Sequence, residues 1–195
     1  MRIGIDIDGV LMDIERFMID YGAKYCTENN LPINIKLGEY DECEFFNWTQ
    51  EEAIKFWNKY LVHYATKYPS REFVSEVIHK LKEEGHEIYI VTARNEYGLP
   101  REYEGKMREI VSKWLEDNDI YYDKIIYTEG SKLPYCVGNY IEVMIEDSPE
   151  NVKDLSNKVE VLCFDCKYNE KLEGKNITRV YSWYDIYNKI KEMCK

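Results

Sequence analysis

Five short apolar runs recur along the chain, and segments with helical spacing of apolar residues separate most of them. The runs cover residues 3–7, 87–92, 124–128, 141–147 and 159–165. The last four show little alternation between apolar and polar residues, which is typical of strands buried on both faces. Strands that alternate with helices build a parallel sheet covered on both sides. We therefore expect an α/β fold with a doubly wound parallel sheet.

One connection is too long for a simple alternation of strands and helices. We expect helices over 14–30, 49–60, 71–84 and 103–118, a short helix after Pro149 and a last helix from Ser182. A single crossover between parallel strands needs only about a dozen residues, whereas the first strand and the helix at 71–84 lie much farther apart. We interpret residues 13–70 as a helical cap inserted after the first strand, with 31–48 as a loop. The core domain would then comprise residues 1–12 and 71–195.

Charge and hydropathy narrow the classes of partner. The 195 residues carry a formal net charge of −11, which argues against polymeric nucleic acid because basic surfaces bind phosphate backbones. A small phosphorylated ligand is compatible with this net charge, since a metal ion and one or two cations can neutralise the ligand locally. No apolar run approaches the roughly 20 residues that span a bilayer, and the first residues lack the features of a signal peptide. We expect a cytoplasmic protein with no membrane partner; pairing as a homodimer is left open.

Two aspartates lie close together in the opening stretch MRIGIDIDGVL. Isoleucines alternate with polar residues up to Asp6 and Asp8, and Gly9 follows. This pattern predicts a strand that feeds a turn. Residues two apart on a strand point to the same face, so the two carboxylates would lie side by side. On a central strand such a pair needs a cation to neutralise it.

Polar residues also end or follow three further predicted strands. They are Thr92, Ala93 and Arg94, then Lys132, then Glu146 and Asp147. The carboxyl ends of parallel strands share one edge of the sheet, so these residues should converge with the first two aspartates. Several carboxylates make an oxygen site suited to Mg²⁺. A threonine, backbone N–H groups and a lysine can hold a phosphoryl group beside it.

The four motifs, in this order, resemble those of the haloacid dehalogenase superfamily of phosphatases. They are DIDGV at 6–10, a hydrophobic strand ending in Thr92, Lys132, and the pair at 146–147. The resemblance extends from residue 3 to about 165, and the helical insertion is similar to that family's cap. The stretches DIDGVL, TAR and IEDSPEN look most like the 5′(3′)-deoxyribonucleotidase branch and the bacterial nucleotidases grouped with it.

The resemblance implies roles for the acidic residues. Asp6 would be the nucleophile that forms an aspartyl-phosphate, and Asp8 would protonate the leaving alcohol and then deprotonate the attacking water. Asp6, the backbone carbonyl of Asp8 and the acidic pair would hold Mg²⁺. The family's acidic pair is often Asp-Asp, whereas this chain has Glu146 and Asp147. We expect Glu146 to bind the ion directly with Asp147 behind it; the alternative is that Asp147 is the direct ligand.

The resemblance also implies a phosphate site. Thr92, the N–H of Ala93 and Lys132 would bind the transferred phosphoryl group. Arg94 either clamps a substrate phosphate or pairs with an acidic residue on the surface. Six aromatic residues of the cap region either stack on a nucleobase or form the core of a small helical bundle; they are Phe17, Tyr21, Phe45, Phe46, Trp48 and Trp57.

These expectations converge on one function and leave two others open. The first is Mg²⁺-dependent hydrolysis of a small phosphate monoester, most plausibly a (deoxy)nucleoside monophosphate. A sugar-phosphate or other metabolite phosphatase would use the same chemistry with a different cap pocket. A phospho-accepting switch or a non-catalytic binding module would share the scaffold without turnover.

Overall fold

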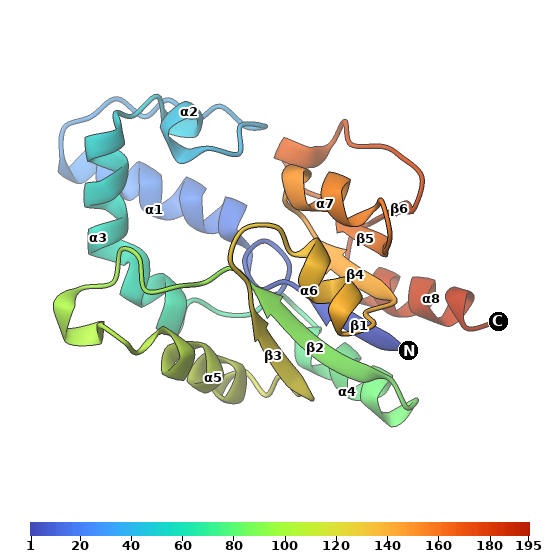
Figure 1. Cartoon of the computed structure of the whole chain (residues 1–195). Helices are drawn as coiled ribbons and strands as arrows, with labels where there is room; N and C mark the ends of the chain where they lie inside the picture. Colours follow the sequence, from blue (N-terminus) through green and yellow to red (C-terminus); the bar gives the residue numbers. More distant parts are fainter.

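The chain builds one six-stranded parallel sheet, as the computed structural model of residues 1–195 shows (Figure 1). The strands are β1 (Arg2–Ile5), β2 (Glu87–Thr92), β3 (Lys124–Tyr127), β4 (Val143–Glu146), β5 (Glu160–Phe164) and β6 (Ile177–Val180). Their order in the sheet is β3-β2-β1-β4-β5-β6, and every neighbouring pair is parallel. The predicted doubly wound α/β fold is confirmed, with β6 as an edge strand beyond the five predicted ones.

Helices cover both faces of the sheet. They are α1 (Ile14–Glu28), α2 (Glu42–Phe46), α3 (Gln50–Lys67), α4 (Val74–Glu83), α5 (Met107–Asp117), α6 (Leu133–Gly138), α7 (Pro149–Leu155) and α8 (Trp183–Met193), with 3₁₀ turns η1 (Arg101–Tyr103) and η2 (Lys167–Asn169). Apolar residues of α4, α5 and α8 form one core with one face of the sheet, and those of α6 and α7 form a second with the other. None of the helices combines the length and apolar character that crossing a bilayer demands.

Four helical segments differ from the sequence-based expectations, and one of them, the helix expected over 103–118, begins only at Met107, after η1. The loop expected over 31–48 contains α2, whose N-terminus the Asp41 carboxylate caps by accepting from the N–H groups of Cys43 and Glu44. The helix expected over 71–84 begins only at Val74, because Phe73 before it adopts a left-handed conformation with φ 65°. The helix expected over 49–60 begins as predicted but continues to Lys67.

The first strand is also shorter than its alternation suggested. β1 ends at Ile5, so Asp6 and Asp8 lie in the turn that follows it rather than on the strand. The Asp6 N–H still donates to the carbonyl of Ile145, at 3.1 Å, which continues the pairing with β4. Since β1 lies between β2 and β4, Asp6 occupies the middle of the sheet's carboxyl edge.

The segment between β1 and α4 stands beyond that edge (Figure 1). Its two ends lie side by side, because Met12 and Ser70 form an antiparallel bridge and the Arg71 N–H donates to the Leu11 carbonyl at 2.8 Å. The guanidinium of Arg71 donates to the Gly9 carbonyl and pairs with Asp13 at 2.8 Å. The chain therefore leaves and re-enters the core through one narrow neck.

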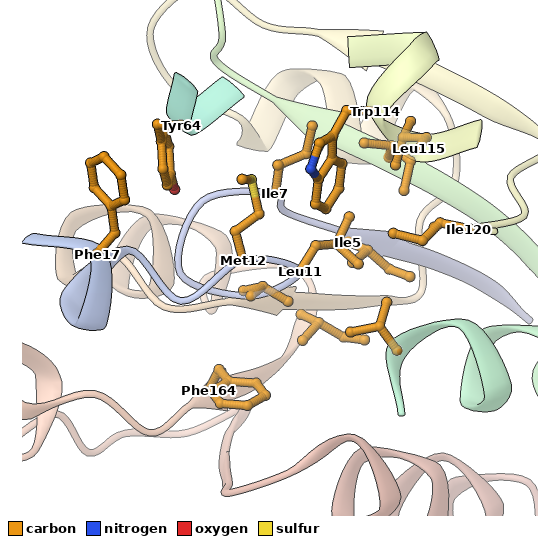
Figure 2. Close-up of a cluster of buried hydrophobic side chains, with 14 of the residues drawn as sticks. Ile5, Ile7, Leu11, Met12, Phe17, Tyr64, Trp114, Leu115, Ile120 and Phe164 are labelled. Atoms are coloured by element: carbon orange, nitrogen blue, oxygen red, sulfur yellow. The ribbon is translucent and has the colours of Figure 1, made fainter. Parts of the chain in front are cut away.

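The inserted helices share a hydrophobic core with the sheet. Figure 2 shows Ile5 and Ile7 beside Met12, with Phe17 of α1 and Tyr64 of α3 farther along the same cluster. Phe17 and Met12 are fully buried. Helix α3 in addition packs against α5. Apolar packing thus holds the insertion against the end of the sheet where the acidic residues lie.

Candidate active site

A cavity of about 670 Å³ opens between the carboxyl edge of the sheet and α3. Six of the residues predicted for the site line it: Asp6, Asp8, Ala93, Arg94, Lys132 and Glu146. Asp147 borders a smaller neighbouring cavity of about 150 Å³, and Thr92 is fully buried behind the wall. The structure therefore gathers the ends of four strands around one space, as the shared edge predicts.

A buried lysine joins two of the carboxylates. The Lys132 ammonium lies 2.6 Å from Asp6 Oδ1 and 2.7 Å from Glu146 Oε2, and its side chain is only 2 % exposed. Burial alone would lower the pKa of Lys132, but Asp6 and Glu146 outweigh it and raise that pKa. Burial raises the pKa of Asp6 to about 7, against the opposing attraction of Lys132. Lys132 is therefore a fixed positive charge beside the expected nucleophile.

One lysine does not neutralise the acids gathered here. Ligand oxygens of Asp6, Glu146 and Asp147 all lie within 4.8 Å of one another, and all three residues are buried. Burial, together with the charges of Glu146 and Asp6, raises the pKa of Asp147 well above its usual range. Three carboxylate oxygens at this spacing are the donor set that hard divalent cations such as Mg²⁺ bind. The residues present therefore fit a divalent metal.

The two acids of the motif differ in how their oxygens are occupied. Glu146 Oε1 accepts from the N–H groups of Asp147 and Ser148 at 3.1 and 3.0 Å, and its Oε2 contacts Lys132. Asp147 Oδ2 accepts from the hydroxyl of Tyr168, whereas Asp147 Oδ1 is buried without a partner. A buried unpaired carboxylate oxygen is costly, so the Asp147 oxygen is the one that most needs a ligand.

The carboxylate of Asp8 faces a different set of partners. Its Oδ1 lies 2.6 Å from Arg94 Nη2 and 2.8 Å from the Tyr64 hydroxyl, and its Oδ2 accepts from Arg94 Nε at 3.0 Å. Burial alone would raise the pKa of Asp8, but Arg94 and the hydroxyl of Tyr64 outweigh it and lower that pKa. Asp8 therefore lies outside the cluster of Asp6, Glu146 and Asp147.

Thr92 and Arg94 form a tight turn after β2. The Thr92 hydroxyl accepts from the Arg94 N–H at 3.1 Å, and the Thr92 carbonyl accepts from the Thr128 N–H at 2.9 Å. The turn directs the Arg94 side chain toward Asp8 and leaves its Nη1 buried without a partner. Phosphate binding by Thr92 and Ala93 stays a prediction.

Gly9 lets the turn after β1 pass against the acidic pair. Its φ is +87°, and a Cβ atom built there would lie 2.0 Å from Asp147 Oδ2. A side chain at this position would collide with the carboxylate and strain the backbone. The glycine is thus part of how the site brings Asp147 close to Asp6.

Three residues of the site were not predicted. Tyr64 and Tyr168 donate to Asp8 and Asp147, and the Asn169 amide donates to the carbonyls of Asp147 and Phe164 at 2.8 Å each. For Tyr64 a signal exists, since the four-residue spacing of aromatic residues continues past the end of the helix expected over 49–60. Tyr168 and Asn169 lie in the 3₁₀ turn η2, whose three residues are too few for periodicity to be visible in the sequence.

Most of the six aromatic residues predicted either to stack on a nucleobase or to form a helical core are packed in the hydrophobic core. Phe17, Phe45, Phe46 and Trp48 are buried in the hydrophobic cluster, and Tyr21 stacks on Phe17 with ring centroids 4.3 Å apart. Trp57, which is half-buried, is the one of the six that lines the cavity. Base stacking by an aromatic of this set therefore depends on Trp57.

Comparisons with known proteins agree with the phosphatase chemistry that the geometry of the site favours. The model of the family "5′ nucleotidase, deoxy (pyrimidine), cytosolic type C protein" matches residues 1–194. A Bacillus cereus protein named "Putative nucleotidase" is 28% identical over 98% of this chain and 99% of its own length.

Solved structures show the same fold. A haloacid dehalogenase-like protein of Agrobacterium tumefaciens superposes with a TM-score of 0.71 at 13% identity, covering 100% of this chain and 99% of its own. YfnB of Bacillus subtilis, described as a HAD-hydrolase bound to magnesium, gives a TM-score of 0.62 at 12% identity over 97% and 98%. The chain therefore has the fold of haloacid dehalogenase-like proteins, belongs to the cytosolic type C 5′-deoxynucleotidase family and is a phosphatase.

Proposed function

We propose that the protein hydrolyses small nucleoside monophosphates, with Mg²⁺ as cofactor and an aspartyl-phosphate on Asp6 as intermediate. The observation that carries the proposal is a cavity large enough for such a ligand, with Asp6, Lys132 and Glu146 in its wall. Ligand cavities of about 300–1,000 Å³ are typical of small-molecule sites. The family match supports the nucleotide as substrate class.

Asp6 and Asp147 would hold the metal, with Glu146 beside them. The unpartnered Oδ1 of Asp147 favours this residue as a direct ligand, whereas hydrogen bonds occupy the oxygens of Glu146. This is the reverse of the order expected from the sequence, in which Glu146 is the direct ligand and Asp147 lies behind it. The magnesium bound by YfnB supports the choice of ion. A bound divalent cation supplies positive charge that offsets the carboxylates and polarises a phosphoryl oxygen.

The side chains would divide the reaction between them. An oxygen of Asp6 forms a bond to phosphorus while the bond from phosphorus to the alcohol oxygen breaks, and the alcohol takes a proton from Asp8. Water then adds to phosphorus and gives a proton to Asp8, and the bond between Asp6 and phosphorus breaks to release phosphate. Lys132 and the free Nη1 of Arg94 are the cations that can bind the phosphoryl oxygens.

The inserted segment would act as the cap that selects the substrate. In this proposal residues 13–70 form the cap on the core of 1–12 and 71–195. The cavity wall contributed by α3 combines the indole of Trp57 and the apolar side chain of Leu61 with the amides of Gln50 and Asn58. An aromatic face beside amide groups suits a nucleobase, which can stack and form hydrogen bonds at its edge.

Phosphate release from a panel of substrates tests the proposal. The panel contains deoxynucleoside and nucleoside monophosphates, sugar phosphates and p-nitrophenyl phosphate, each with Mg²⁺ or with EDTA. We expect release from nucleotides that disappears with EDTA and in Asp6→Asn, but persists in Asp117→Asn, which changes an exposed aspartate paired with Lys113 on α5.

Other outcomes would point elsewhere. Faster release from sugar phosphates than from nucleotides would replace the substrate class but keep the chemistry. Asp6 that becomes phosphorylated and stays so would favour a phospho-accepting switch. No release from any member of the panel would contradict a phosphatase of this class.

A further inference from the structure

One hydrogen bond connects the inserted segment to the residue expected to move the proton. The Tyr64 hydroxyl, on α3, donates to Asp8 Oδ1 at 2.8 Å across 56 residues of sequence. The carboxylate of Asp8 has two side-chain partners, of which Arg94 comes from the sheet side and Tyr64 from the insertion. The orientation of Asp8 therefore depends on where α3 lies.

Packing fixes the direction in which Tyr64 donates. Its side chain is 3 % exposed, its ring centroid lies 4.5 Å from that of Phe17, and the Arg94 guanidinium lies 5.4 Å from it. Figure 2 shows Tyr64 beside Phe17, at the end of the cluster that runs through Met12. With the ring held on these sides, the hydroxyl leaves Asp8 only if α3 moves.

In the proposed mechanism Arg94 also binds the substrate phosphate, whereas Tyr64 does not. Its Nη1 is buried without a partner and Arg94 lines the cavity, so a phosphate that binds this nitrogen attracts the guanidinium away from Asp8. When Arg94 turns to the phosphate, the hydroxyl of Tyr64 is the side-chain donor that still holds Asp8 Oδ1. The other oxygen, Oδ2, is then free to carry the proton.

We propose that Tyr64 is a positioning residue: its hydroxyl orients the Asp8 carboxyl group so that proton transfer to the leaving alcohol occurs only while α3 covers the site. This inference rests on the proposed phosphatase mechanism. The bond from phosphorus to the alcohol oxygen breaks as Asp6 bonds to phosphorus, and the proton on Asp8 Oδ2 moves to that alcohol oxygen. Tyr64 itself exchanges no proton.

The same helix offers a matched control. Tyr60 lies one turn before Tyr64, is also buried, and donates its hydroxyl to a carboxylate, that of Glu28, at 3.0 Å. Glu28 is not part of the cavity wall. Tyr60→Phe therefore removes the same group from the same helix without changing the contacts of Asp8.

The test compares two leaving groups in single-turnover reactions with Mg²⁺. A nucleoside 5′-monophosphate releases an alcohol that needs a proton, whereas p-nitrophenyl phosphate releases an anion that is stable without one. We expect Tyr64→Phe to slow nucleoside release by about 10- to 100-fold, and nitrophenolate release by less than about threefold. Tyr60→Phe should leave both rates within about twofold of the wild type. Circular dichroism and thermal unfolding check that each variant is folded.

A double-mutant cycle gives a second readout. If Tyr64 acts through Asp8, adding Tyr64→Phe to Asp8→Asn should cause little further loss of nucleoside release. Equal slowing of both leaving groups by Tyr64→Phe, no slowing of either, or additive losses in the cycle would each overturn the positioning role. A wild-type protein that releases neither leaving group would instead overturn the proposed function, and this inference with it.

Discussion

At the scale of single residues, the site depends on a glycine as strictly as on its acids. In Gly9→Ala the new Cβ would collide with the Asp147 carboxylate, at a backbone φ of +87°. Gly85 has the same φ and nothing within 4 Å of its Cβ position, so Gly85→Ala has the backbone cost alone, about 1 kcal/mol. We expect Gly9→Ala to lose at least about tenfold more nucleotidase activity than Gly85→Ala, and to be less stable in urea unfolding. Equal effects of the two changes would contradict the role of close approach to Asp147.

Which residues could be predicted from sequence follows from how they are placed. Asp6 and Lys132 follow strands and Glu146 ends one, and the shared edge of a parallel sheet brings such residues together whatever the loops do. Tyr64 and Tyr168 reach their partners across 56 and 21 residues, through the packing of an insertion and of the short 3₁₀ turn η2. Local periodicity carries no information on such distances, so both contacts required the structure.

At the scale of elements, the five predicted strands differ from β6, which was not predicted, in how much local sequence determines them. The five predicted strands contain runs of apolar residues, which pack against the helices of the sheet. β6, in contrast, has the partly polar sequence ITRV and is a half-exposed edge strand. Helix α2 has five residues, too few for helical spacing to be visible, and depends on its Asp41 cap. An edge strand with a partly polar sequence and a single-turn helix depend on tertiary neighbours, which is why the pattern of apolar residues does not reveal β6 and α2, whereas the apolar sequence of β3 reveals that edge strand.

Asp123 shows how one loop residue secures an element, and its effect should depend on pH. Its carboxylate accepts from the Ile88 N–H of β2 at 2.8 Å and from Lys82 at 2.7 Å. Burial opposes these contacts, but the hydrogen bonds prevail and lower the pKa of Asp123. Because the folded-state pKa lies below the unfolded value of about 3.9, the stabilisation is present above that pH and is lost as pH falls through the folded value.

We therefore expect Asp123→Asn to lower the free energy of unfolding by about 1–2 kcal/mol at pH 7, with a difference that shrinks below about pH 4. Urea unfolding of both proteins between pH 3 and 7 measures this. A stability difference that stays constant over the range would show that the charge of Asp123 is not what holds β2.

At the scale of the whole molecule, the residues of the candidate active site lower the stability of the fold. The insertion shares one of the two hydrophobic cores with the sheet, and at the carboxyl edge of the sheet three buried carboxylates face one ammonium. Burial of this kind disfavours the charged forms, as the raised pKa of Asp147 shows. The fold tolerates the arrangement because the packing around it is extensive, and a bound cation would remove most of the cost.

This leads to a prediction on metal binding that needs no catalysis. A cation that binds only the folded state at a hundred times its Kd stabilises it by about 2.7 kcal/mol, which for a chain of this size raises Tm by about 5–10 °C. We expect Mg²⁺ to raise the Tm of the wild type in this way. In Asp147→Asn the amide still accepts from Tyr168 and removes one buried charge, so the metal-free variant should melt higher than the wild type while Mg²⁺ raises its Tm much less. Asp20→Asn, which changes an exposed aspartate paired with Arg16, should respond to Mg²⁺ like the wild type. An unchanged response in Asp147→Asn would place the ion away from Asp147 and leave Glu146 as its ligand beside Asp6.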